Sequence, residues 1–127
     1  MKTRLFILLL FFISATCVTM TAQTPPPPPD DIPLNPPGGH KPKGLTETPV
    51  VYAFYTNDTL TVSITDYYGD VIVTVEDAVS GIIQTTQTEY VNWKSNITTD
   101  IHSLLSGYYV LYIRLDNDDE YVGYFSK

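Results

Sequence analysis

Apolar and polar residues alternate along the chain after residue 50, and this period of two predicts short β-strands rather than helices. In residues 104–115, LLSGYYVLYIRL, a leucine pair and a glycine precede a strand with Tyr109, Leu111 and Ile113 on one face. The opposite face is also largely apolar, which is typical of a central strand covered on both sides. We therefore predict a structural core that includes Leu105, Tyr109, Leu111 and Ile113.

Similar runs predict six further strands, at residues 50–55, 59–65, 71–76, 82–90, 96–99 and 120–125. Turn-forming residues separate them. Residues 66–69 have the aspartate and glycine of a type I turn, residues 77–81 form a hairpin loop closed by a glycine, and residues 116–119 form a polar turn. Short strands separated by turns predict an all-β fold, an antiparallel β-sandwich of about seven strands, with an open barrel as the alternative packing.

The predicted strand at residues 82–90 differs from the others, because its middle, QTTQT, is polar on both faces. A strand with no apolar face suits the edge of a sheet. We predict that its unpaired main-chain groups offer a binding edge to an extended segment of a partner protein.

The N-terminal part of the chain has a different composition. Residues 1–22 begin with Lys2 and Arg4, continue with nine apolar residues at 5–13 and end in small and polar residues, which predicts a signal peptide. The apolar run is shorter than the roughly 20 residues of a membrane-spanning helix. All ten prolines lie between Pro25 and Pro49, which favours an extended spacer. We divide the chain into a signal peptide (1–22), a proline-rich linker (23–49) and a β-sandwich domain (50–127).

Charge and cysteine content restrict the location and the partners. Cys17 is the only cysteine, and cleavage after Ala22 removes it, so no disulfide is expected; lipidation of Cys17 is the alternative. Without Lys2 and Arg4, five basic residues face fourteen acidic ones, a net charge of −9, which disfavours nucleic acid as a partner. We expect an exported protein, periplasmic, outer-membrane-associated or secreted, with no membrane span after cleavage and with a protein or glycan partner in the cell envelope.

Catalytic and metal-binding residues have little support. His102 is the only histidine of the β-rich region, and its neighbours Asp100 and Ser103 suit a capped turn better than a catalytic triad. Residues 116–120, DNDDE, offer oxygen ligands but lack the glycine and the spacing of an EF-hand loop; we predict a polar hairpin turn, with a weak calcium site as the alternative. We expect a non-enzymatic protein without a catalytic centre, a metal site or a cofactor.

Aromatic residues suggest a second kind of ligand. Four of them fall at predicted loops or strand ends, where exposed rings can stack on sugars: Trp93, Tyr67, Tyr68 and Tyr90. The alternative is a core position for the tryptophan and packed rings for the tyrosines. Asp58-Thr59-Leu60 is similar to the D-T-aliphatic acceptor of Bacteroides protein O-glycosylation, which implies Thr59 as a candidate modified residue; a turn that opens a strand is the alternative.

The C-terminal half resembles known domains. Its VIVTVEDAVSG hairpin, the run IHSLLSGYYVLYI and the last strand ending in Lys127 are similar to the C-terminal sorting domains of the type IX (Por) secretion system. The layout of signal peptide, spacer and β-domain resembles a family of small exported Bacteroides proteins of unknown function, and the tyrosine after the Leu-Ser-Gly corner is similar to the tyrosine corner of immunoglobulin-like domains. This resemblance implies an immunoglobulin-like sandwich.

Three functions follow from these patterns. We prefer an exported non-enzymatic binding or assembly module. The alternatives are a carbohydrate-binding domain that uses Trp93 and the loop tyrosines, and a secretion sorting-type domain.

Overall fold

A computed structural model describes residues 28–36 and 48–127; the predicted signal peptide, including Cys17, lies outside these residues. The described residues form seven strands: β1 (Asp30–Ile32), β2 (Leu34–Asn35), β3 (Val50–Tyr55), β4 (Thr59–Asp77), β5 (Ile83–Asp100), β6 (Tyr108–Leu115) and β7 (Glu120–Ser126). Every pairing between them is antiparallel. The predicted all-β, antiparallel architecture is confirmed.

The strand β4 is continuous across residues 66–69, so the turn predicted there is wrong. The strand bends instead of reversing, because Asp66 has a φ of 63° and the pairing with β5 shifts register between Thr65 and Tyr67. Such an irregularity increases the local bend and twist of a strand. β5 follows the bend, with Trp93 at a φ of 70°, and joins the two strands predicted at 82–90 and 96–99 into one.

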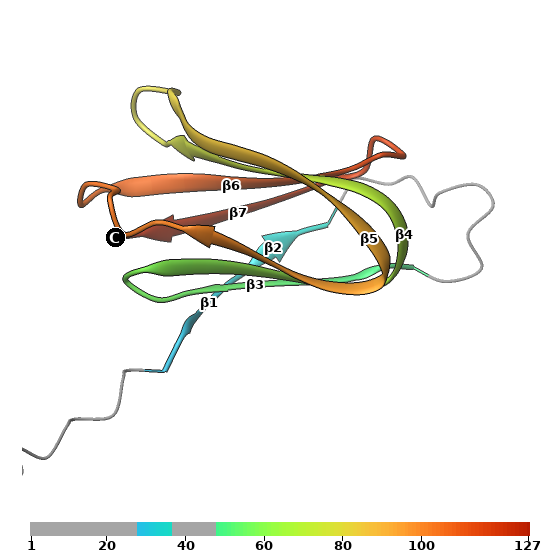
Figure 1. The fold of residues 1–127 in the computed structure, drawn as a ribbon. Helices are drawn as coiled ribbons and strands as arrows, with labels where there is room; N and C mark the ends of the chain where they lie inside the picture. Colours follow the sequence, from blue (N-terminus) through green and yellow to red (C-terminus); the bar gives the residue numbers. More distant parts are fainter. Residues whose placement is uncertain (1–27, 37–47) are drawn as a thin grey trace, which may run out of the picture.

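The bend divides β4 and β5 between two layers (Figure 1). In the first layer, residues 59–65 of β4 pair with β3 on one side and with the second half of β5 on the other. In the second layer, residues 71–77 of β4 pair with β6, and β6 pairs with β7; the first half of β5 lies on the other side of β4. β5 is therefore an edge strand of both layers.

Apolar side chains from both layers fill the space between them. Nine of them, from both halves of β4 and from β6, are at most 1% exposed: Leu60, Val62, Ile64, Val71, Val73, Val75, Leu111, Ile113 and Leu115. Tyr109 is also buried, so three of the four predicted core residues lie in the core. Leu105 is 81% exposed, and its assignment to the core is wrong. It lies in the irregular turn before β6, where alternation does not apply, and Leu104 packs against the core instead.

Part of the predicted linker belongs to the sheets. Residues 30–35, which we call the strap, cross from the first layer to the second on the side opposite β5, because β1 pairs with β3 and β2 pairs with β7 (Figure 1). Ile32 of the strap is 4% exposed and lies in the core. Gly123 of β7 leaves room for the crossing: a Cβ atom there would lie 2.6 Å from Ile32 Cγ2 and 2.9 Å from Leu34 Cδ2.

The turn before β6 is fixed to the end of β7. The Tyr109 hydroxyl donates a hydrogen bond to the Leu105 carbonyl oxygen at 2.5 Å, the contact that defines a tyrosine corner. Gly107 and Lys127 exchange two backbone hydrogen bonds of 2.9 Å. The Lys127 ammonium donates to the carbonyl oxygens of Ile101 and His102. These bonds satisfy the carbonyls of a turn that has no regular secondary structure.

Candidate functional site

The free side of β5 is the candidate site. β5 pairs with β4 alone, and no other strand of the described residues lies on its second side. Its pairing is regular from Thr85, opposite Val75, to Asn92, opposite Tyr68. We call residues 85–92 the open edge segment; it contains no proline, and Glu89 is its only charged residue. The edge strand predicted at 82–90 is confirmed, and it has few of the prolines and charges that usually protect such edges.

Inward-facing polar side chains of this segment connect the two halves of β5. The Gln87 side-chain amide donates to the Thr98 carbonyl oxygen at 3.3 Å and accepts a hydrogen bond from the Thr99 hydroxyl at 3.0 Å. The Ser95 hydroxyl donates to the Glu89 carboxylate at 3.3 Å. These contacts span the side of the sandwich where the two layers end, so the strand needs polar residues on its inner face as well as its outer one.

The outer face of the segment carries threonines and a tyrosine. The hydroxyls of Thr74 and Thr86 are 3.0 Å apart, and Thr86, Thr88 and Tyr90 are exposed. No strand of the described residues pairs with the segment on its free side. An incoming strand would therefore meet small hydroxyl side chains and unpaired main-chain groups.

The first residue of the hairpin loop that leads into β5, Asp77, stabilises this loop. The Asp77 carboxylate accepts hydrogen bonds of 2.9 Å from the N–H groups of Val79 and Ser80. These bonds, first that of Ser80 and then that of Val79, lower the pKa of Asp77. Beyond them the hairpin presents apolar side chains to solvent, with Val79 89% and Ile82 62% exposed. The start of the open edge segment is thus accessible.

The four aromatic residues predicted to contact glycans do not form one surface. Tyr67 is 3% exposed, because the bend of β4 turns it into the core, so its placement in an exposed loop is wrong. Its hydroxyl donates to the Asp116 carboxylate and accepts from the Asp116 N–H at 3.1 Å. Burial, followed by the contact with Asp116, raises the pKa of Tyr67 well above its ordinary range.

The other three aromatic residues remain accessible near the bend. Tyr68 is 60%, Trp93 46% and Tyr90 64% exposed. The rings of Tyr68 and Trp93 contact each other, with centroids 5.9 Å apart and planes inclined by 46°. Tyr68 lies opposite Asn92, two residues along β5 from Tyr90. These rings border the C-terminal end of the open edge segment.

The remaining predicted sites lie apart from this edge. Thr59 opens β4, is half-buried, and donates its backbone N–H to the Thr56 hydroxyl at 3.2 Å. Beside it, Asp58 contacts His102 Nδ1 at 2.9 Å, and both side chains are exposed.

The turn at 116–120 uses its polar side chains locally. The Asp116 carboxylate contacts the Tyr67 hydroxyl, and the Asn117 amide contacts the Asp119 carboxylate at 3.2 Å. Within residues 28–36 and 48–127, no three histidine, cysteine or acidic side chains are grouped to hold a metal ion. None of the residues that the structure describes forms a helix long and apolar enough to cross a membrane.

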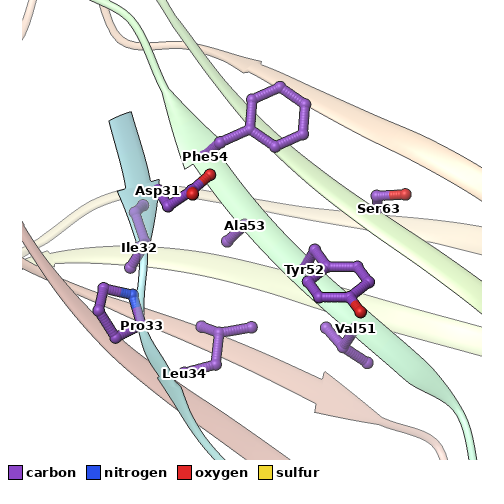
Figure 2. Close-up of a pocket in the computed structure, with 9 residues that line it drawn as sticks. All are labelled: Asp31, Ile32, Pro33, Leu34, Val51, Tyr52, Ala53, Phe54 and Ser63. Atoms are coloured by element: carbon purple, nitrogen blue, oxygen red, sulfur yellow. The ribbon is translucent and has the colours of Figure 1, made fainter. Parts of the chain in front are cut away.

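Two hollows were not apparent from the sequence. The larger, about 580 Å³, lies between the strap and β3, and Figure 2 shows Pro33, Leu34 and Tyr52 among the residues around it. The smaller, about 270 Å³, lies on the outer face of the second layer and is lined by Ile72, Thr74, Glu76, Tyr112, Arg114 and Glu120. Alternation identifies these residues as outward-facing, but only the register between β4, β6 and β7 brings them together.

Comparisons with known proteins support the fold. No protein-family model matches the chain, and a search of curated proteins finds no match. A similar solved structure is a DUF3244 family protein with an immunoglobulin-like β-sandwich fold from Bacteroides vulgatus, with a TM-score of 0.63, 20% sequence identity, and coverage of 79% of this chain and 99% of that chain. At this identity the likeness establishes the fold alone and does not extend to the type IX sorting domains. The chain has the immunoglobulin-like β-sandwich fold that the sequence predicts.

Proposed function

We propose that the protein is an exported, non-enzymatic binding or assembly module that takes up an extended segment of a partner protein along β5. The observation that carries this proposal is the regular, proline-free segment 85–92, which is paired on one side only. Strand addition uses main-chain hydrogen bonds, so it needs no particular side chain from the partner. Export rests on the predicted signal peptide. A relationship to the small exported Bacteroides proteins of unknown function is part of the same proposal.

The other edges of the sandwich are poorer binding sites for a strand. The first layer ends in β1, which pairs over three residues, and the second ends in β2, which pairs over two. Pro33 lies between them, and a proline cannot donate a hydrogen bond to an added strand. Among the described strands, β5 thus offers the long edge.

Site-specific photo-crosslinking tests the proposal. A photoreactive residue in place of Thr88, beside the open edge, should form a covalent adduct with an envelope protein of the source organism. The same residue in place of Tyr124, which is 63% exposed on β7, is the control and should form none.

Proline variants identify the main-chain groups involved. Successive residues of a strand direct their N–H groups to opposite edges, so one of Thr85→Pro and Thr86→Pro removes an N–H from the free side and the other removes a bond to β4. The variant that keeps the native melting temperature is the one with its proline on the free side. It should lose the adduct; equal adduct yields from this variant and the parent would refute strand addition.

A carbohydrate-binding function is the second candidate, and the contact between Tyr68 and Trp93 favours it. Two exposed rings at this distance give a surface on which a sugar ring can stack. Binding to a glycan array should decrease for Trp93→Ala and Tyr68→Ala and persist for Tyr52→Ala, a 65% exposed tyrosine of β3. Absence of binding by the parent protein across host and dietary glycans would end this candidate.

A further inference from the structure

We infer that the strand added to β5 is the open edge segment of a second copy of this chain, paired antiparallel about a two-fold axis at Gln87. This inference rests on the proposed function and names its partner. It would join the second layers of two sandwiches into one continuous sheet through β5.

The sequence of the segment is complementary to itself in this arrangement. A two-fold axis at Gln87 places Thr86 opposite Thr88 of the other copy on the outer face, and Thr85 opposite Glu89 on the inner face. Within one chain the outer-face threonines Thr74 and Thr86 already pair with their hydroxyls 3.0 Å apart. Threonine pairs across strands contribute favourably to a sheet. The intermolecular pairing would repeat this contact twice.

Charge favours the antiparallel register over the parallel one. Glu89 is the only charged residue between Gln84 and Asn92. An in-register parallel pairing would place the two Glu89 side chains next to each other, and like charges at adjacent positions of neighbouring strands are destabilising. The two-fold antiparallel pairing separates the two carboxylates.

The strap limits the assembly to two copies. β5 branches from the hydrogen-bonded path at β4 and is open along its length, whereas the two ends of the path, β1 and β2, are short and lie on either side of Pro33. A contact that uses the same surface on both copies closes on itself, so pairing through β5 produces a dimer rather than a filament.

Net charge makes the association salt-dependent. Residues 28–36 and 48–127 contain thirteen acidic and three basic residues, a net charge of −10 for the described part of each copy. Two such copies repel each other, and salt screens this repulsion. We expect the dimer to strengthen as NaCl rises from about 0.02 M to about 0.3 M.

Sedimentation velocity on residues 23–127, the chain without its predicted signal peptide, tests the inference. We expect the dimer fraction to rise with protein concentration and to be measurable at or below about 200 µM protein. The variant with Thr86→Lys and Thr88→Lys, and the variant with Thr86→Glu and Thr88→Glu, each place like charges opposite each other and should dimerise about tenfold more weakly. An equimolar mixture should restore dimerisation, because each lysine then faces a glutamate.

Matched controls separate the register from a general charge effect. The same substitutions at Asn96 and Thr98, exposed outer-face positions in the second half of β5, change the charge equally and should leave dimerisation within about twofold. A parent protein that stays monomeric at about 0.3 M NaCl, or a mixture that does not associate, would overturn the inference. An adduct between the Thr88 photo-crosslinker and a different protein would in that case leave the proposed function standing, and the absence of any adduct would remove both.

Discussion

Gly123 of β7 tests the strap directly, because the structure leaves no room for a methyl group there. A Cβ atom would lie 2.6 Å from Ile32 Cγ2, 2.9 Å from Leu34 Cδ2 and 3.2 Å from the Pro33 carbonyl oxygen. The first two atoms end side chains, but the third belongs to the backbone, so the new methyl group presses on the main chain of the strap as well as on its side chains. Gly123→Ala should therefore strain the strap or displace it.

The decrease in the free energy of unfolding depends on which of these two outcomes occurs. If the strap stays in place, overpacking costs about 1–3 kcal/mol. If it leaves, Ile32, which is 4% exposed, leaves the core, and removal of a buried isoleucine side chain costs about 2–5 kcal/mol. The chain adopts the less costly outcome, so we expect the free energy of unfolding to decrease by about 1–3 kcal/mol.

Guanidinium unfolding followed by the fluorescence of Trp93, the single tryptophan, measures this free energy. Hydrogen exchange at the amides of Ile32 and Leu34 reports on the strap itself. Gly107→Ala is the matched control, because a Cβ atom there meets nothing within 4 Å. Both substitutions reduce the entropy of the unfolded chain equally, so the difference between them isolates the contact with the strap.

A double-mutant cycle identifies the contact. Ile32→Ala removes the atom nearest to the new methyl group, so Gly123→Ala should cost less in that background, with a coupling of at least about 0.5 kcal/mol. Equal unfolding free energies for Gly123→Ala and Gly107→Ala, combined with no coupling to Ile32, would refute the crossing of the strap over β7.

Three further predictions concern the core, the bend and the hairpin. Leu111→Ala, at a fully buried position, should lower the free energy of unfolding by about 2–5 kcal/mol, whereas Leu105→Ala should change it by less than about 0.5 kcal/mol in the same denaturant titration. The pKa of Tyr67 is raised on folding, so the stability contributed by its neutral form is complete below about pH 10, where the unfolded tyrosine begins to ionise, and is lost at higher pH. Tyr67→Phe should lower stability by about 1 kcal/mol at pH 7 and should show a shallower alkaline loss by circular dichroism; parallel alkaline curves would contradict this. The pKa of Asp77 is lowered on folding, so Asp77→Ala should lower the melting temperature at pH 7, and the difference from the parent should shrink below about pH 4; a difference that is constant with pH would exclude a role for the carboxylate charge.

Alternation was a reliable guide wherever a strand is buried on one face. It identified β3, β6 and β7 almost to the residue, and it placed Tyr109, Leu111 and Ile113 correctly, because a one-residue slip would move each of these side chains to solvent. The polar strand was identified as an edge for a sound reason. Its inner face is polar because Gln87 and Glu89 contact Thr99 and Ser95 where the two layers end.

The errors share a cause: local signals do not show how far a strand continues. Asp66 and Gly69 are turn residues by type, but here they let β4 bend from one layer to the other, and this bend carries Tyr67 into the core. Leu105 lies three residues before β6 begins at Tyr108, so the alternation of that strand does not extend to it. The strap was missed because the prolines before and after it, together with Pro33, predict a spacer; the signals for it were Ile32 and Leu34, two apolar residues on either side of Pro33.

One side of the sandwich is covered and the other is open, and this difference links the strap to the proposed dimer. On one side the strap covers β3 and the middle of β7; on the other, β5 is left open. If the strap is displaced, β3 and β7 become open edges as well, and a chain with open edges on both sides can associate without closing. If hydrogen exchange shows that Gly123→Ala displaces the strap, this variant should convert a closed dimer into larger assemblies at high protein concentration, while Gly107→Ala should not. A Gly123→Ala variant with a displaced strap that still stops at two copies would show that the strap does not limit assembly.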